Sequence, residues 1–247
     1  MLSIDLNCDL GESTHLWPYD IKNELALLPY ISSMNLACGL HAGDPHTLHE
    51  LVQAGLRANL RIGAHPGFND RENFGRKELK IAPHKIYDLV LYQLGALQGF
   101  LSVHNGVMHH VKPHGALYNM AARDATLAAA IASAVKAFNP RLILMGLAGS
   151  QLIRMAEVVG LPTSSEVFAD RSYQADGSLT PRDQPGALLD DPEKVVAQIT
   201  QMLNSGSVTT VDGQEIPVFA DTVCIHGDGS NALELAKAIH TAVQLTI

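Results

Sequence analysis

The sequence predicts an α/β protein in which parallel strands alternate with helices, either as a (β/α) barrel or as a doubly wound sheet. Strand-like and helix-like segments alternate about seven times along the 247 residues. Several strand-like runs end in acid, imidazole or amide side chains, as Ile62-Gly63-Ala64-His65 does. Because the carboxyl ends of parallel strands lie on one face, these side chains are expected to converge in an active site.

Composition favours one domain, residues 1–247, with a large aliphatic core. Hydrophobic residues make up 47% of the chain and aromatic residues only 5%, so small and branched side chains must fill the interior. A formal charge of -8 argues against a nucleic-acid partner. No signal peptide or membrane-length apolar run is visible, so we expect a cytoplasmic protein that does not bind membranes.

The first half of the chain contains four expected strands, at 3–8, 31–38, 61–65 and 108–112. A helix is expected at 45–58, because Asp44 can cap it and Pro45 suits its first turn. Another, at 83–103, begins at Pro83 and has apolar residues at helical spacing.

The second half continues the alternation, with strands expected at 141–146, 162–168 and 222–226 and helices at 124–138, 150–159, 192–204 and 230–244. The Asp212-Gly213 pair predicts a hairpin between 208–211 and 215–218. Residues 170–186 are polar, and loops of this length in compact domains are commonly lids or binding loops.

Polar residues alternate along the first expected strand, where Asp5, Asn7 and Asp9 point one way if the strand continues through them. A buried parallel strand is normally apolar on both faces, so this pattern indicates a function. A hydrogen-bonded barrel bottom or a helix cap is the structural alternative. Glu12 follows as either a surface residue or part of the same rim.

Three histidines, His41, His65 and His114, follow or end strands in glycine-containing turns. Lys112 and His114 alternate with period two, so both can face one substrate. Lysine can bind phosphate or polarise a carbonyl, and histidine can transfer protons near neutral pH. A core histidine with satisfied hydrogen bonds is the alternative.

Further polar residues would complete the rim. Arg171 follows Glu166 and Asp170 at the start of the long loop and suits a carboxylate or phosphate, with a salt bridge inside the loop as the alternative. The sequence contains neither a P-loop nor a GxGxxG motif after a strand. The candidate substrate- or phosphate-binding residues are Asp5, Asn7, Asn35, His41, Arg76, Glu166, Asp170, Arg171, His226 and Asp228.

Six segments together resemble the LamB/YcsF family, whose members form the A subunit of prokaryotic 5-oxoprolinase. They are DLNCDLGE (5–12), NLACGLHAGDP (35–45), IGAHPGF (62–68), VKPHGALYN (111–119), EVFADRSYQADGSL (166–179) and CIHGDGSNA (224–232). The resemblance implies a distorted seven-stranded β/α barrel of the glycoside hydrolase and deacetylase type. It also implies ATP-dependent opening of 5-oxo-L-proline to L-glutamate with partner subunits B and C, and is compatible with a homo-oligomer.

The catalytic candidates are then Asp9, His65, Lys112 and His114. Lys112 would contact a phosphoryl or carbonyl oxygen, and His114 or His65 would act as acid and base. Asp5, Asn7 and Asp9 would orient these groups or hold Mg²⁺ arriving with ATP.

Two other functions fit the same residues. A metal-dependent amide hydrolase or deacetylase, acting on a small carbohydrate or cyclic amide, would hold Zn²⁺ between Asp9, His41, His65 and His114. A sugar- or lactam-binding regulatory protein would use the cleft without catalysis.

Overall fold

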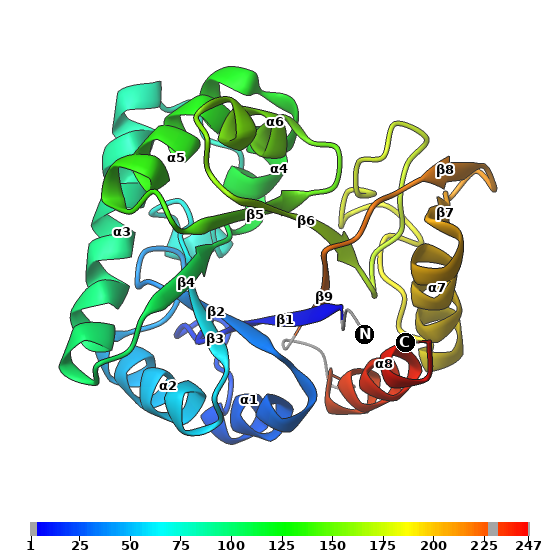
Figure 1. Ribbon diagram of the computed structural model, residues 1–247, viewed down its shortest axis with the longest axis horizontal. Helices are drawn as coiled ribbons and strands as arrows, with labels where there is room; N and C mark the ends of the chain where they lie inside the picture. Colours follow the sequence, from blue (N-terminus) through cyan, green and yellow to red (C-terminus); the bar gives the residue numbers. More distant parts are fainter. Residues whose placement is uncertain (1–3, 227–231, 247) are drawn as a thin grey trace.

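The computed structural model describes residues 4–226 and 232–246. Within these residues seven parallel strands close into a barrel with helices outside it (Figure 1), which confirms the barrel and not the doubly wound sheet. In neighbour order the strands are β1 (Asp5–Leu10), β2 (Ser33–Ala37), β3 (Arg61–His65), β4 (Met108–Val111), β5 (Ile143–Leu147), β6 (Thr163–Phe168) and β9 (Thr222–His226).

The barrel closes through β9, the last strand of the chain, which lies between β1 and β6. Asp5 pairs with Thr222, and Glu166 pairs with the same residue from the other side. The ladder is irregular where β3 meets β4, because the register shifts between Ile62 and Gly63.

The described helices surround the barrel. They are α1 (Ile21–Leu27), α2 (Pro45–Arg57), α3 (Pro83–Val103), α4 (Gly115–Arg123), α5 (Ala125–Phe138), α6 (Gln151–Val158), α7 (Pro192–Ser205) and α8 (Ala232–Thr246), with short 3₁₀ turns η1 (Leu28–Tyr30) and η2 (Arg71–Asn73). The Asp44 cap is confirmed, since its side chain accepts from the backbone N–H groups of His46 and Thr47.

Two helices were not predicted. Helix α4 begins directly after His114, and no side chain caps it; the sequence there shows only Pro113 and Gly115, which are turn signals. Helix α1 is short, but Asp20 is a sequence signal for its start, since aspartate is favoured at the N-cap position. In the structure the Asp20 side chain accepts a hydrogen bond from the Lys22 backbone N–H.

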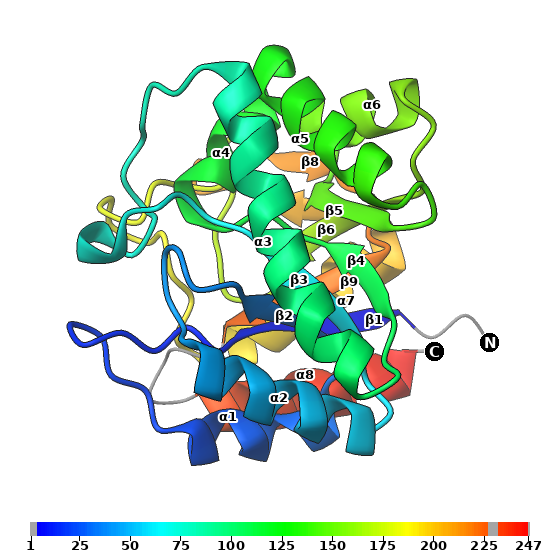
Figure 2. The same cartoon turned by 90° about the vertical axis from the view of Figure 1, so that its left-hand side faces the viewer.

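Helix α3 is long and apolar enough, by length and composition, to cross a membrane, which the sequence analysis did not anticipate. In the structure it covers the barrel instead (Figure 2). Ile86, Val90, Leu94 and Leu97 are fully buried along one face at helical spacing. The hydrophobicity of α3 is therefore explained by packing on the sheet and on α5.

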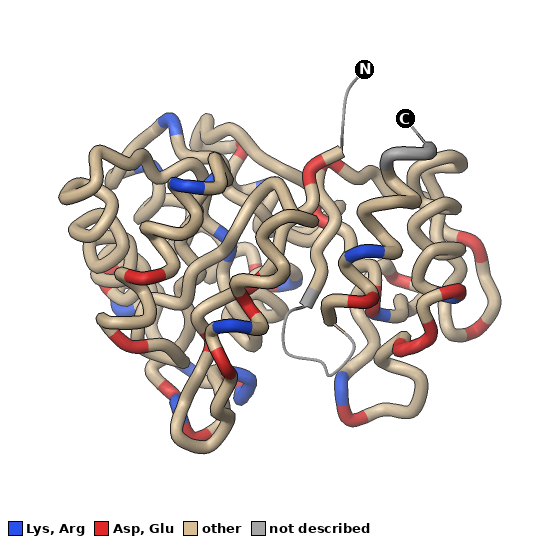
Figure 3. The backbone as a smooth tube through the Cα atoms, turned by 90° about the horizontal axis from the view of Figure 1, so that it is seen from below, with Lys and Arg blue, Asp and Glu red and all other residues tan. Residues whose placement is uncertain are grey.

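The expected hairpin is confirmed as the antiparallel pair β7 (Ser207–Thr209) and β8 (Glu215–Pro217). In Figure 2 the loops after β1 and β3 and the long segment 169–191 lie on the side of the barrel opposite the chain termini. This side is the carboxyl end of the strands, where barrel active sites lie. Lys and Arg are interspersed with Asp and Glu along the chain in the view of Figure 3.

The interior of the barrel is polar. Barrels of this class usually fill their interior with branched apolar side chains, whereas here Asn7, Asn35, His110, Lys112 and Glu166 are all buried. Apolar residues such as Cys8, Leu10 and Leu36 belong instead to the hydrophobic core.

Candidate functional site

The amino end of the barrel is closed by a hydrogen-bonded carboxylate. Asp5 accepts from the hydroxyls of Ser32, Ser33 and Thr222, each at 2.6 Å, and from Arg61 at 3.2 Å. Burial raises the pKa of Asp5, but these hydroxyl donors outweigh it and lower the pKa overall. Asp5 therefore stabilises the end of the barrel away from the cavity described below.

An amide and imidazole network fills the middle of the barrel. The Asn35 amide donates to Asn7 Oδ1 at 2.7 Å and to Asp9 Oδ1 at 2.8 Å. His110 Nε2 lies 2.6 Å from Asn35 Oδ1, which can only accept. Burial lowers the pKa of His110 to about 3 although Asp5 opposes the shift, so His110 is neutral and donates through Nε2.

Lys112 is a buried cation between two carboxylates. Its Nζ lies 2.9 Å from Asp9 Oδ1, 2.7 Å from Glu166 Oε1 and 3.2 Å from Asn7 Oδ1. The Tyr118 hydroxyl donates to the other Glu166 oxygen at 2.7 Å. Burial lowers the pKa of Lys112, but the facing acidic groups, Asp9 foremost, outweigh it and hold the pKa well above its usual range.

Above this ion pair, three imidazoles converge on one carboxylate. Glu12 Oε1 lies 2.8 Å from His114 Nδ1, 3.2 Å from His41 Nε2 and 3.4 Å from His65 Nε2. All four side chains are buried. The His41 and His114 rings stack with centroids 3.9 Å apart, and the His65 ring meets both edge-on.

The outer ring nitrogens of two of these histidines face backbone carbonyls. His65 Nδ1 lies 2.7 Å from the Lys112 carbonyl oxygen, and His114 Nε2 lies 2.8 Å from that of Phe74. Since a carbonyl oxygen only accepts, both nitrogens carry a proton. These contacts fix the ring orientations and the tautomers of the neutral rings.

The imidazoles differ in basicity. Burial lowers the pKa of His41 to about 3, with the neighbouring His114 adding to the shift. Burial also lowers the pKa of His65, but Asp9 and Glu12 outweigh it and raise the pKa to about 9. Burial lowers the pKa of His114 against the opposing effect of Glu12. Neighbouring imidazoles with separated pKa values are typical of acid–base sites.

Two glycines allow the rings to pack. Gly75 has φ of +61°, and a Cβ there would lie 2.8 Å from the His41 Cβ and 3.1 Å from His114 Cδ2. Gly67 lies closer still to the His41 ring, and a Cβ at this residue would overlap Nδ1. The loop after β3 thus holds the imidazoles through glycine contacts that no other residue could make.

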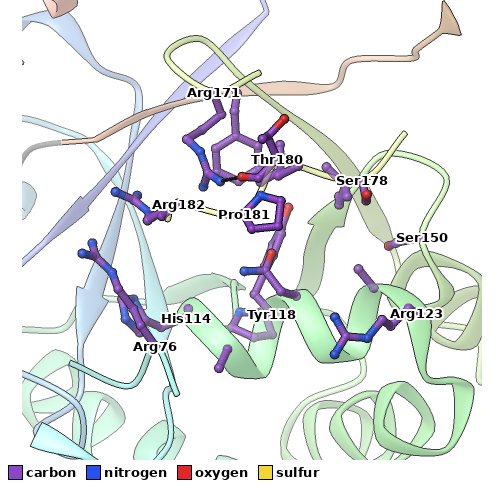
Figure 4. Close-up of a pocket in the computed structure, with 18 of the residues that line it drawn as sticks. Arg76, His114, Tyr118, Arg123, Ser150, Arg171, Ser178, Thr180, Pro181 and Arg182 are labelled. Carbon is purple, nitrogen blue, oxygen red and sulfur yellow. Dashed lines mark hydrogen bonds between the residues drawn. The ribbon is translucent and has the colours of Figure 1, made fainter. Parts of the chain in front are cut away.

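A cavity of about 830 Å³ opens above the cluster. Asp9, Glu12, His65, Lys112 and His114 are among the residues that line it. Figure 4 shows three arginines on the side where His114 lies, whereas Arg123 and Ser150 are on the far side. The three are Arg76, Arg171 and Arg182. Such a cavity can hold an anionic ligand above proton-transferring groups.

Arg171 also holds the long loop. Its guanidinium donates to the backbone carbonyls of Thr180 at 2.6 Å and Ala187 at 3.2 Å. Burial lowers its pKa to about 10, with Arg182 and Arg76 contributing. Arg76 lies over the Phe74 ring at 4.7 Å from the centroid. The arginines are therefore close enough to share one electrostatic environment.

The predicted residues fall into three groups. Those that line the cavity are Asp9, His65, Arg76, Lys112, His114 and Arg171. Those that do not are Asp5, Asn7, Asn35, His41, Glu166 and Asp170, of which Asn7, Asn35, His41 and Glu166 contact the lining residues from below. The His226 side chain and Asp228 lie outside the described residues.

Three cavity residues were missed by the sequence analysis as site candidates. Glu12 was left open between surface and rim, although Gly11 directly after the strand signals a turn that can aim the next side chain inward. Tyr118 lies on the unpredicted α4, and Arg182 lies within the long polar loop. Neither carries a local signal beyond its residue type.

The predicted Mg²⁺ and Zn²⁺ ligand sets fit the structure differently. Asp5 and Asp9 are four residues apart on one strand, about 13 Å, so they cannot hold one Mg²⁺ together, and each already accepts several hydrogen bonds. The ligand atoms of Glu12, His41, His65 and His114, in contrast, all lie within 4.8 Å of one another. This convergent set contains Glu12 where the sequence analysis placed Asp9.

A parallel β/α barrel with buried acids and imidazoles under a cavity at its carboxyl end is the architecture of a barrel enzyme. The sequence matches the LamB/YcsF family over residues 4–246, and the chain belongs to this family. It is 53% identical to the A subunit of 5-oxoprolinase from Brevibacillus brevis, across 98% of this chain and 95% of the relative. Its identity to the Bacillus subtilis protein of the same name is 51%, across 97% and 92%.

Solved structures share the fold. The crystal structure of a lactam utilization protein from Thermus thermophilus superposes with a TM-score of 0.90 at 43% identity, covering 98% of this chain and 96% of that one. A GH20 catalytic module of a pneumococcal exo-β-D-N-acetylglucosaminidase gives a TM-score of 0.53 at 9% identity, covering 98% and 85%. The second likeness concerns the fold alone.

Proposed function

We propose that this chain is the A subunit of an ATP-dependent 5-oxoprolinase, which opens 5-oxo-L-proline to L-glutamate and releases ADP and phosphate. The observation that carries the proposal is the buried Glu12–His114–His65 cluster beside the Asp9–Lys112 ion pair, beneath a cavity with arginines. Relatives at about half identity bear the name of the 5-oxoprolinase A subunit, which supports the same activity.

The reaction requires proton transfers that this cluster can perform. A five-membered lactam is a stable amide, so phosphorylation of its carbonyl oxygen by ATP provides the driving force for ring opening. Water then adds to the carbonyl carbon, and the ring C–N bond breaks as the nitrogen takes up a proton, which leaves an acyl phosphate. A second water hydrolyses this acyl phosphate to the free carboxylate of glutamate and phosphate. We propose His114 and His65 as the acid and base, with Glu12 and Asp9 setting their basicity.

Lys112 and the arginines are the cations proposed to contact the oxygen atoms of the substrate and of the phosphoryl group. Lys112 Nζ donates to Asn7 Oδ1, Asp9 Oδ1 and Cys224 Sγ and also pairs with Glu166. A contact with a carbonyl or phosphoryl oxygen would therefore require exchange of one of these acceptors. Arg76 and Arg182 are proposed to bind the substrate carboxylate or a phosphoryl group, because a guanidinium matches both geometries. Mg²⁺ would arrive coordinated by the phosphates of ATP.

Two partner subunits, B and C, are part of the proposal, as is a cytoplasmic location. A single domain without a recognisable nucleotide motif has little room for separate sites for nucleotide, lactam and water. The relatives are named as one lettered subunit of 5-oxoprolinase, which indicates an assembly in those proteins.

The test is reconstitution. The isolated chain should show negligible ATP hydrolysis dependent on 5-oxoproline, and the addition of subunits B and C should restore it with equal amounts of glutamate, ADP and phosphate. A mixture lacking only this chain is the control. Robust glutamate formation by this chain and ATP alone would overturn the dependence on partners, and none from the complete mixture would overturn the activity.

A second candidate function is a metal-dependent amide hydrolase that needs no ATP. The convergence of Glu12 and three histidines favours it. Ring opening by the metal-loaded chain without nucleotide would establish it, and strict dependence on ATP would exclude it.

A further inference from the structure

We propose that Glu12, His41, His65 and His114 form a transition-metal centre that takes Zn²⁺ or an ion of similar softness. The inference rests on the arrangement of these four side chains and not on the ATP-dependent step. It replaces the acid–base roles proposed above for His65 and His114, because an imidazole nitrogen that binds a metal ion cannot also transfer a proton. It concerns a resident ion, distinct from the Mg²⁺ that accompanies a nucleotide.

The lone pairs of the inner imidazole nitrogens point toward one another. The outer nitrogens of His65 and His114 carry protons for the backbone carbonyls, so in the neutral rings the inner nitrogens are bare acceptors. These two acceptors lie 3.0 Å apart, and both face Glu12 Oε1, a third acceptor. With both rings neutral, these three buried acceptors would repel one another, so a cation, either a proton or a metal ion, belongs between them.

A single shared proton meets this requirement incompletely. Placed on His65 or His114, it could satisfy one acceptor pair and leave the other contacts repulsive. His41 adds a third imidazole nitrogen at 3.2 Å from the same carboxylate oxygen, and its Nδ1 is buried without a hydrogen-bond partner among the described residues. A metal ion could bind Glu12, His65 and His114 together. His41 would become the fourth ligand after its ring turns, because it now lies parallel to the His114 ring at 3.9 Å between centroids.

The spacing also suits such an ion. In a tetrahedral site with Zn–N and Zn–O distances near 2.0–2.1 Å, neighbouring ligand atoms are about 3.3–3.4 Å apart. The three contacts of Glu12 Oε1 with the imidazoles and the contact between His65 and His114 run from 2.8 to 3.4 Å. Three imidazoles and one carboxylate form a donor set typical of Zn²⁺, whereas Mg²⁺ prefers oxygen ligands alone.

The surrounding contacts resemble those that support metal ligands. Ligating histidines commonly donate their other N–H to a backbone carbonyl, which fixes the tautomer, and His65 and His114 do so here. Asp9 is committed to Lys112 and Asn35 through Oδ1, so it is assigned to orient His65, whose Nε2 is 3.4 Å from Oδ2. Glu12, His65 and His114 line the cavity, so an ion held by them is accessible to a ligand there.

The test uses the full chain, stripped with a chelator, incubated with Zn²⁺ or Co²⁺ and then dialysed. We expect about one ion per chain by elemental analysis and a Co²⁺ absorption spectrum characteristic of four-coordinate nitrogen and oxygen ligation. Glu12→Gln and His41→Gln should each weaken Zn²⁺ binding roughly tenfold to a hundredfold in a competition titration. Asp9→Asn should retain the ion with a smaller loss of affinity.

A second histidine pair provides the matched control. His49, within α2, and His104, directly after α3, approach to 2.7 Å between Nε2 atoms, and neither belongs to the four-residue cluster. The double variant His49→Gln/His104→Gln should bind Zn²⁺ as tightly as the unaltered chain. Loss of the ion in this control, or no retained ion and an octahedral Co²⁺ spectrum in the unaltered chain, would overturn the proposal, even if the ligand variants failed to fold.

Discussion

His114 connects the buried cluster to the cavity, because it lines the cavity while its Nδ1 faces Glu12. Replacing His114 with Ala removes a proposed acid or base, so turnover of the reconstituted enzyme should fall by about a hundredfold or more. The measurement is the initial rate of glutamate formation. The exposed His84 provides the control, since His84→Ala should keep full activity. Near-normal turnover by His114→Ala would show that the proton is transferred elsewhere.

Lys112 stabilises the polar interior. In Lys112→Met, Asp9 and Glu166 would remain buried without their cation, so the free energy of unfolding should fall by about 3–5 kcal/mol. Denaturant unfolding measures the change. The same substitution at the exposed Lys85 should change stability by less than about 1 kcal/mol. Equal effects at the two positions would mean that water reaches the interior charges.

The burial of His110 predicts that the folded protein loses stability at low pH. Burial lowers its folded-state pKa to about 3, below the value near 6.5 of an unfolded chain. The unfolded state therefore binds the extra proton first, and stability present above pH 6.5 is lost as the pH falls toward 3. Between pH 7 and pH 5 the protonation of this residue alone should lower the free energy of unfolding by about 2 kcal/mol.

The groups facing His110 are Asp5, His109, Lys112 and Arg61. Of these only Asp5 favours the protonated ring, and it does not outweigh burial. Urea titrations at both pH values should show a smaller acid loss in His110→Gln than in the unaltered chain. His84→Gln should retain the whole loss. Identical pH dependence in all three proteins would contradict the assignment.

The loop after β3 depends on a glycine in the left-handed region. In Gly75→Ala the new Cβ would meet the His41 and His114 side chains, in addition to backbone strain of about 1–2 kcal/mol. Gly213 is the matched control, since its φ is +78° and a Cβ there would have no atom within 4 Å. Backbone strain should lower the free energy of unfolding of both variants. Only Gly75→Ala should lose a further 1–3 kcal/mol or so of stability, together with most of the activity. Unfolding titrations of the two variants measure the difference.

The regular elements were predictable where local signals were complete. Asp44 with Pro45, and the apolar spacing after Pro83, located α2 and α3 to within one residue at either end. Helix α4 was missed because it follows a Pro-His-Gly turn without a capping side chain, and it owes its position to packing. The strand expected at 31–38 is shorter, at Ser33–Ala37.

The sequence located the site at the carboxyl ends of the strands but could not determine its depth. Alternation along β1 correctly predicted that Asp5, Asn7 and Asp9 share a face. It could not show that they belong to different levels of the barrel, because depth depends on the strand register. Asp9 reaches the cavity, whereas Asp5 closes the opposite end. Which carboxylate meets the three histidines is a tertiary property, and it is Glu12.

The place of β9 between β1 and β6 has a consequence for how the protein is made. Thr222 bonds to Asp5 across 217 residues of sequence, so the first strand leaves the ribosome roughly 10 to 40 s before its last neighbour exists. An apolar strand left unpaired for that time would invite association with other nascent chains. The acids and amide of β1 are well solvated during this interval, so the same polar residues that fill the barrel interior also protect the unfinished protein.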